Sequence, residues 1–231
     1  MESTHWWYRV RREIAVDILR QLIVPGHSEA NILDVGCGAG GLMAEAGVFG
    51  DVCGIDISSQ AVGFCRGRGI SKVHVGDATA IPYPTCSFDI VIAMDVVEHI
   101  KDDRIALSEI HRVLKPGGYC VITVPAFQEL WGITDELSHH YRRYRRGEIA
   151  KQMEAANLVV KRSTYFNTLL FAPIALIRLA VRLMGITMDS ENASPRFVNG
   201  LLYRIFHLEV WLLRLVDFPF GVSVLAVVQK S

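Results

Sequence analysis

The sequence predicts an α/β protein with a doubly wound, seven-stranded sheet whose last strand is antiparallel. Three observations support this prediction: short apolar runs alternate with helical segments, a glycine-rich turn follows the first run, and residues 88–94 (FDIVIAM) form a nearly continuous apolar run. Strands that are buried on both faces are typical of parallel sheets covered by helices on each side. The fold class therefore follows from the order of these segments.

Each element is expected where an apolar run or a helical periodicity occurs. Predicted strands cover residues 31–35, 51–55, 72–75, 88–94, 119–124, a run that opens at 158–161, and 222–228. Predicted helices cover residues 6–23, 42–49, 59–66, 104–114, 148–157, 168–186 and 198–216. Pro25 and Gly26 are expected to end the first helix, and Pro116, Gly117 and Gly118 to form a turn before the fifth strand.

Composition excludes several classes of protein. Among 231 residues, 24 Lys and Arg balance 24 Asp and Glu, which leaves no overall basic charge for general nucleic-acid binding. The five cysteines are an odd number and contain no C-x-x-C pair, so we expect reduced thiols in the cytoplasm and no structural zinc site. The first 13 residues (MESTHWWYRVRRE) lack the apolar segment of a signal peptide.

The glycine-rich segment ILDVGCGAGG, residues 32–41, lies where the first strand turns into a helix. Glycines at such a turn allow positive φ angles and let a ligand approach the backbone closely. Gly36, Gly38 and Gly41 also satisfy G-x-G-x-x-G, with Asp56 about 20 residues later, so a nicotinamide-binding domain remains an alternative. A Walker A loop is excluded because no Gly-Lys-Ser/Thr follows.

Further motifs follow the glycine loop in a fixed order. Asp34 precedes the first glycine, Asp56 ends the second predicted strand, and Asp77 follows the third. The segments DVVEH (95–99) and LKPGG (114–118) then lie between the fourth and the fifth predicted strands. With these motifs, residues 30–162 resemble the class I S-adenosylmethionine-dependent methyltransferases, specifically the small-molecule group related to the ubiquinone and menaquinone methylases. A nicotinamide dehydrogenase would account for only the first two motifs.

The resemblance implies S-adenosylmethionine as cofactor, released as S-adenosylhomocysteine, and implies a role for each matching position. The cofactor-binding residues that it indicates are Tyr8, Arg12, Asp34, Gly36, Cys37, Gly38, Asp56, Ile57, Asp77, Ala78 and Met94. The carboxylate of Asp56 would hold the ribose hydroxyls, and that of Asp77 would accept from the adenine amino group. Simpler roles stay open for both: a helix N-cap for Asp56 and a turn residue for Asp77.

The segment 125–147 is expected to border the acceptor, because ligands of open α/β sheets bind at the carboxyl ends of the strands. Its HHYRRY stretch is similar to a His-x-Arg-Arg-Tyr element of this family. His140 is our candidate general base, and His139, Tyr141, Arg143 and Trp131 are candidate substrate contacts. The alternatives are a structural histidine and arginines that pair with Asp135 and Glu136. No metal ligands stand out at a recognisable spacing, so the sequence predicts a metal-independent reaction.

Three parts make up the predicted organisation: an N-terminal helix over the cofactor site (1–26), a methyltransferase domain (27–167 plus 217–231) and an apolar helical insert (168–216). The insert has three open interpretations: a lid over an apolar acceptor, a homodimer interface, or a peripheral membrane contact. Trp6 and Trp7 could line the substrate pocket or cap the core. Glu98 and His99 are equally open between a functional and a structural role.

The predicted function is methyl transfer from S-adenosylmethionine to a small, hydrophobic or lipid-linked acceptor, with oxygen as the expected methylated atom. Two alternatives are a nicotinamide-dependent oxidoreductase and a non-catalytic module that binds S-adenosylmethionine or a partner. The expected location is the cytoplasm, with possible association with a membrane surface, and nucleic acid is not expected as a partner.

Overall fold

The computed structural model describes residues 5–23, 30–184 and 196–231. Its helices are α1 (Trp6–Leu22), α2 (Gly41–Ala46), α3 (Ser59–Gly67), α4 (Asp103–Val113), α5 (Ile133–Leu137), α6 (Arg146–Ala155), α7 (Phe171–Met184) and α8 (Arg196–Leu212), with short 3-10 helices η1 (Val97–His99) and η2 (Gln128–Leu130). Its strands are β1 (Ala30–Val35), β2 (Gly50–Asp56), β3 (Val73–Val75), β4 (Phe88–Met94), β5 (Leu114–Pro125), β6 (Leu158–Phe166) and β7 (Ser223–Lys230). Pro25, Gly26 and the predicted end of the helix at residue 186 lie outside the described residues.

The seven strands form one sheet in the order β3-β2-β1-β4-β5-β7-β6. Strands β1 to β5 run parallel to one another, whereas β7 runs antiparallel to both β5 and β6. The predicted doubly wound sheet with an antiparallel last strand is therefore confirmed. The chain reverses its order of strands between β1 and β4, and in open α/β sheets ligands bind beside such a switch point.

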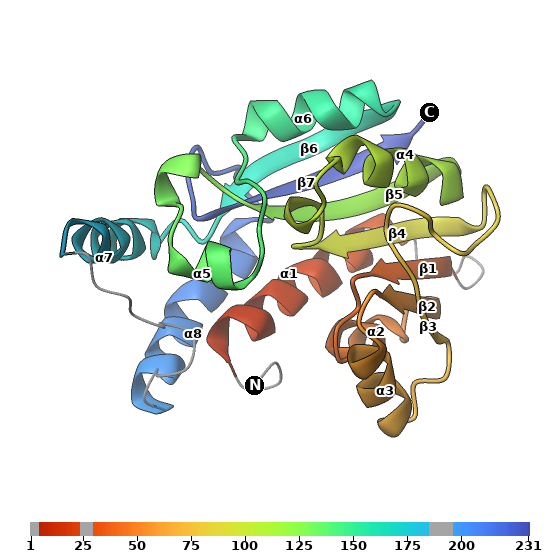
Figure 1. Ribbon diagram of the computed structural model, residues 1–231, viewed down its shortest axis with the longest axis horizontal. Coiled ribbons are helices and arrows are strands. Elements are labelled where there is room, and N and C mark those ends of the chain that lie inside the picture. The colour runs from red at the N-terminus through yellow and green to blue at the C-terminus, as the bar shows by residue number, and fades with distance from the viewer. Residues whose placement is uncertain (1–4, 24–29, 185–195) are drawn as a thin grey trace.

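Helices cover both faces of this sheet (Figure 1). On one face, Leu107 and Ile110 of α4 and Ile149 of α6 pack on β4, β5 and β7. On the other face, residues of α1, α2 and α8 share a second core with Ile32 and Val121. Strands β1, β4 and β7 are thus buried from both sides over most of their length, which explains why their sequences are largely apolar without alternation.

The structure differs from the prediction at several element ends, such as that of α8 at Leu212 rather than residue 216, and in three further places. Helix α2 ends at Ala46 rather than residue 49, and Gly47 is its C-cap residue. Residues 116–118, predicted as a turn, lie within β5 where the β4–β5 register shifts. Helix α5 was not predicted, since its five residues are too short to show a helical periodicity.

The predicted helical insert between β6 and β7 is present as α7 and α8. Helix α8 packs along α1, with Phe206 fully buried and stacked on Trp7 at 5.5 Å between ring centroids. Helix α7 has no buried residue, and Leu176 and Leu183 are 66% and 77% exposed. Among the described residues, no helix combines the length and the apolar character that a membrane crossing requires.

Candidate active site

The glycine loop between β1 and α2 takes a conformation that other residues would strain. Gly36, Gly38 and Gly40 have φ angles of +71°, +54° and +77°. A Cβ on Gly36 would lie only 2.5 Å from the side chain of Val96, so space as well as φ requires glycine there. The amides of Gly36 and Cys37 donate to the carbonyl of Ile55, which ties the loop to the end of β2.

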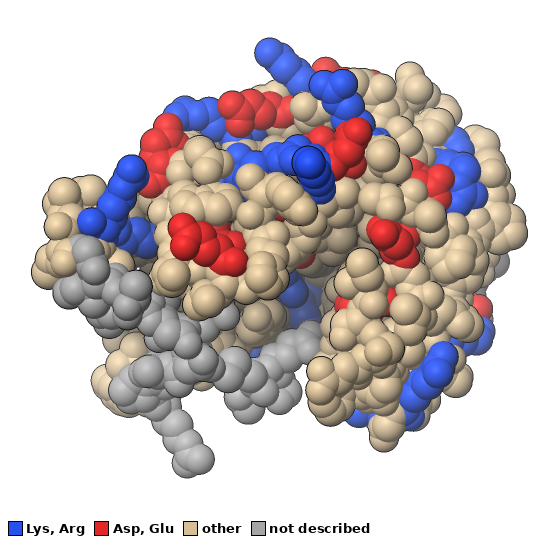
Figure 2. Space-filling view, in the orientation of Figure 1, with Lys and Arg blue, Asp and Glu red and all other residues tan. Residues whose placement is uncertain are grey.

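A cavity of about 340 Å³ opens over this loop. The residues that line it are Tyr8, Arg11, Arg12, Asp34, Gly36, Cys37, Gly38, Leu42 and Met94. Seven of them are among the cofactor-binding residues predicted from sequence, and Arg11 and Leu42 are additions. Figure 2 shows this side of the molecule hollowed between the part that carries α5 and the part that carries α2 and α3. The cavity therefore lies at the carboxyl ends of the parallel strands, as expected for an open α/β sheet.

The N-terminal helix places two neighbouring arginines, Arg11 and Arg12, in the lining of the cavity. Arg12, the residue predicted to contact the cofactor, pairs through Nε with Glu45 at 2.9 Å. Its neighbour Arg11 pairs with Asp95, the first residue after β4, and also donates to the carbonyl of Met94 at 3.4 Å. A carboxylate on α2 thus holds Arg12, while Arg11 ties α1 to the end of β4.

Asp56, the last residue of β2, and Asp77, which follows β3, are not among the residues that line the cavity. Asp56 accepts from the amide of Gly38 with one carboxylate oxygen and from that of Ser58 with the other, both at 2.9 Å. Asp77 accepts from the amide of Thr79 at 2.8 Å, a turn contact that fits the simpler role foreseen for it. Ile57 is 75% exposed, and Ala78 packs against the core. Asp56 is in contact with the glycine loop, so it remains well placed beside a ligand bound there.

A buried ionic cluster organises the segment after β5. The carboxylate of Asp135, which is 1% exposed, accepts from His140 Nδ1 at 2.9 Å, Arg143 Nε at 2.8 Å, Arg178 Nη1 at 3.0 Å and the amide of Gly132 at 2.9 Å. Burial alone would raise the pKa of Asp135, but the hydrogen bond from His140 and the charges of the two arginines hold it well below the usual range. This carboxylate therefore orients the imidazole of His140.

The other predicted substrate contacts differ in how far they are exposed. Arg143 is 7% exposed and also donates to the carbonyl of Ala126, so the alternative in which it pairs with Asp135 is the one observed. Tyr141 is 55% exposed, and His139 is exposed with a φ of +55°. Trp131 is half-buried after η2. Arg143 therefore serves the scaffold of the loop in this structure, whereas Tyr141 and His139 remain accessible.

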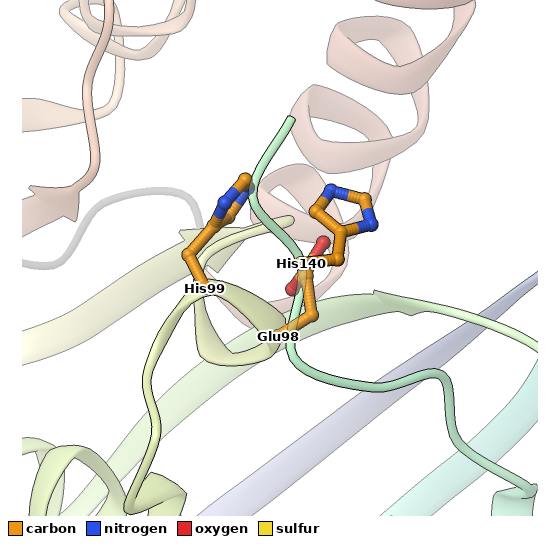
Figure 3. Close-up of side chains that lie close together, drawn as sticks. All are labelled: Glu98, His99 and His140. Atoms are coloured by element: carbon orange, nitrogen blue, oxygen red, sulfur yellow. The ribbon is translucent and has the colours of Figure 1, made fainter. Parts of the chain in front are cut away.

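Glu98 and His99 of η1 meet His140 at the end of β4 (Figure 3). One candidate ligand atom from each of the three side chains lies within 4.8 Å of the other two, and the two imidazole centroids are 4.5 Å apart. Burial raises the pKa of Glu98 well above its usual value, with the nearby charge of Asp95 adding to the effect. Burial and the adjacent His140 lower the pKa of His99. Sequence spacing missed this group because residue 140 is far from 98 in the chain.

Comparison with known proteins identifies a domain within the chain. Residues 33–122 match the model of a methyltransferase domain. The chain contains a class I S-adenosylmethionine-dependent methyltransferase domain. S-Adenosylmethionine is the cofactor of that domain, so the match favours it over the nicotinamide alternative. The matched range holds the glycine loop and most of the cavity lining, while the insert and the HHYRRY segment lie beyond it.

Individual relatives of the methyltransferase domain act on different kinds of atom. Norajmaline N-methyltransferase from Rauvolfia serpentina is 34% identical over 46% of this chain and 39% of its own length. The ubiquinone biosynthesis O-methyltransferase of Idiomarina loihiensis is 27% identical over 74% of this chain and 73% of its own length. The chain thus spans less than half of the first relative, and the two names differ in the methylated atom.

The solved structures show the same fold. A putative sarcosine dimethylglycine methyltransferase from Galdieria sulphuraria superposes with a TM-score of 0.64, covering 96% of this chain and 86% of that one at 21% identity. At this identity the likeness concerns the fold alone. The fold is therefore shared, and the acceptor has to be inferred from this chain's own residues.

Proposed function

We propose that this chain transfers a methyl group from S-adenosylmethionine to a small, hydrophobic or lipid-linked acceptor, and that the methylated atom is oxygen. The observation that carries the proposal is the cavity over the glycine loop, which Met94 of β4 helps to line, together with His140, which meets η1 just after the same strand. A donor pocket and an oriented imidazole then share one edge of the sheet. The O-methyltransferase among the relatives supports oxygen, while the N-methyltransferase keeps nitrogen as the second candidate.

The residues around the cavity suit the donor. Gly36 and Gly38 permit close approach of a ligand to the backbone, and Asp34 places a carboxylate in the lining, which favours the cationic amino and sulfonium groups. Arg11, Arg12 and Tyr8 line the same cavity from α1 and offer donors to the carboxylate end. Asp56 accepts a hydrogen bond from the amide of Gly38 and is the candidate for holding the ribose.

S-Adenosylmethionine supplies a methyl group on a positively charged sulfur. The chain's contribution would be to align the acceptor oxygen with that methyl carbon, which can account for roughly 7–11 kcal/mol of the barrier. As the C–O bond forms, the electron pair of the C–S bond stays on sulfur, and His140 accepts the hydroxyl proton. Asp135 keeps the ring proton on Nδ1, so the lone pair of Nε2 is available for that step.

The helical insert supports an apolar acceptor. Exposed apolar side chains on α7 and α8 include Leu176, Leu183, Phe197 and Trp211. Arg178 of α7 reaches Asp135 and Thr134, so the insert is joined to the segment that holds His140. This link favours the lid interpretation over a distant docking surface. The second interpretation of residues 168–216 is a peripheral membrane contact or a homodimer interface. The proposed location is the cytoplasm.

The test separates donor binding from catalysis. Calorimetry with S-adenosylhomocysteine should show one binding site, and incubation with S-adenosylmethionine and hydroxyl-, carboxyl- or amine-bearing apolar acceptors should give a product heavier by one methylene unit in mass spectrometry. His140→Gln should keep donor affinity and lower turnover about 10²–10⁴-fold, the usual contribution of a general base. His74→Gln, an exposed histidine on β3, is the matched control and should change neither.

Two outcomes would contradict the proposal. Absence of donor binding by folded protein would remove methyl transfer altogether. Donor binding without turnover of any acceptor class, together with unchanged behaviour of His140→Gln, would instead support a non-catalytic module that binds S-adenosylmethionine.

A further inference from the structure

We propose that Glu98, His99 and His140 form a binding site for a divalent transition-metal ion of the zinc class. Two imidazoles and one carboxylate are a ligand set that proteins use for Zn²⁺, and the same set is less suited to Mg²⁺ or Ca²⁺, which prefer oxygen ligands alone. The three side chains converge from η1 and from the segment that follows α5 (Figure 3). The inference stands on geometry and does not depend on methyl transfer.

The carboxylate of Glu98 is the first independent sign of a ligand. Glu98 is 0% exposed, and neither of its carboxylate oxygens accepts a hydrogen bond from any residue that the structure describes. A buried carboxyl group without partners is unfavourable whether it is ionised or protonated, and such groups are rare in folded proteins. A bound cation would satisfy both oxygens at once.

The neighbouring arginines donate to acids other than Glu98. Arg11 is paired with Asp95, and both Arg143 and Arg178 are paired with Asp135. Arg11 and Arg143 still act on Glu98 through space, but neither donates a hydrogen bond to it in the described structure. Asp95 therefore receives one arginine and Asp135 receives two, whereas the carboxylate of Glu98 lies beside the two imidazoles.

His140 is already held as a metal-binding histidine usually is. Its Nδ1 lies 2.9 Å from Asp135 Oδ1, so the proton belongs on Nδ1 and the lone pair on Nε2. Histidines that bind metals commonly donate their second ring N–H to a carboxylate, which fixes the tautomer and increases the basicity of the ligating nitrogen. Asp135 supplies that second contact here. The backbone adds a further link, because the amide of Tyr141 donates to the carbonyl of Glu98.

The distances fit a site that would close by a small side-chain movement. The candidate ligand atoms lie within 4.8 Å of one another. Tetrahedral Zn²⁺ with bonds of about 2.0–2.1 Å requires ligand atoms about 3.4 Å apart. His99 is exposed, so its ring can make most of that adjustment without disturbing the core. Three protein ligands would leave a coordination position for water or for another oxygen ligand.

Metal binding and general-base catalysis compete for one atom. A metal bound at Nε2 of His140 occupies the lone pair that would otherwise accept the proton of the acceptor. The two roles therefore belong to different states of the protein, and the site has to be tested by metal binding itself rather than by turnover.

The experiment uses the full chain, prepared without a histidine tag and stripped of metal with a chelator that is then removed. Titration with Co²⁺, followed by its visible absorption, and competition with Zn²⁺ should show one equivalent bound. We expect Glu98→Gln, His99→Gln and His140→Gln each to weaken binding at least about tenfold, because loss of even a residue that only orients a metal ligand typically costs about 10–100-fold. His74→Gln is the matched control and should bind as tightly as the unaltered chain.

Binding of S-adenosylhomocysteine, measured on the same preparations, reports folding and the donor site separately. The metal site is overturned if folded protein shows no saturable Co²⁺ binding, or if His99→Gln binds within twofold of the unaltered chain. Should the buried Glu98→Gln fail to fold, the exposed His99 still decides the question. Loss of metal binding in the variants with intact donor binding would support the site whatever the outcome for methyl transfer.

Discussion

The two sides of the candidate active site are built by different means. The donor side, defined by the cavity and the glycine loop 36–41, depends on backbone conformation within a short stretch of chain. The acceptor side, defined by Asp135, His140, Arg143 and Arg178, depends on ion pairs such as that between Arg178 and Asp135, which are 43 residues apart. A compact motif can therefore be shared by many methyltransferases, while the acceptor side can change with each loop and insert.

The sharpest way to break the acceptor side alone is Asp135→Asn. Loss of one partner from a buried ion pair costs about 3–5 kcal/mol, because Arg143 would be left buried without its carboxylate. Denaturant unfolding should show this loss, while affinity for S-adenosylhomocysteine should change less than about twofold. Asp217→Asn, which removes the exposed pair with Arg162, is the control and should cost less than about 1 kcal/mol. Equal effects of the two variants would contradict the special role of Asp135.

Low pH should reduce the stability difference between the unaltered chain and Asp135→Asn. The pKa of Asp135 is depressed in the folded protein, so its stabilising contribution is fully present above the unfolded value of about 3.9 and declines as the pH falls below it. The stability gap between the unaltered chain and Asp135→Asn should be constant from neutral pH down to about pH 5 and should narrow below about pH 4. A gap that widened on acidification would show that the sign is wrong.

Gly36→Ala should break the donor side alone. The φ of +71° and the 2.5 Å approach to Val96 both oppose a Cβ at this position. We expect affinity for S-adenosylhomocysteine to fall at least about 100-fold, equivalent to about 2.7 kcal/mol. Gly63→Ala in α3 has nothing within 4 Å of the added carbon and should leave that affinity unchanged. Calorimetry on both variants measures their affinities for S-adenosylhomocysteine, so that a methyl group added at a strained position is compared with one added where there is room for it.

Substitutions of the two arginines of α1 test which of them contributes more to donor binding. Arg11 joins α1 to Asp95 at the end of β4, whereas Arg12 pairs with Glu45 of α2, which is 42% exposed. Arg11→Gln should weaken donor binding about tenfold, and Arg12→Gln by less, because an exposed ion pair contributes little. The reverse order of affinities in calorimetry would return the main role to Arg12.

The smallest effect on stability is expected in the insert. Leu176→Glu with Leu183→Glu changes two exposed side chains of α7 and should alter the free energy of unfolding by less than about 0.5 kcal/mol per site. If α7 contacts an apolar acceptor, turnover of that acceptor should fall while donor affinity stays constant. A change in oligomeric state or in vesicle binding, with turnover intact, would favour the dimer or the membrane interpretation instead.

Several parts of the molecule could be foreseen because their cause is local. The strand at 88–94 matches β4 throughout, since a nearly continuous apolar run between polar turns leaves few other structures open. The glycine loop was recognisable because its glycines are required by positive φ angles at fixed spacing. Residues with no local signal were missed: Arg11 differs from Arg12 only by where α1 directs it, and α5 is too short for a periodicity.

The sequence by itself determined the class of fold, the order of its elements and the glycine turn of the donor side, because these depend on neighbours along the chain. Only the tertiary structure decided which arginine meets Asp95, that Asp135 holds His140, and that Glu98 and His99 meet an imidazole from residue 140. Side chains distant in sequence are brought together by the sheet and its covering helices, and no periodicity or spacing records such a meeting.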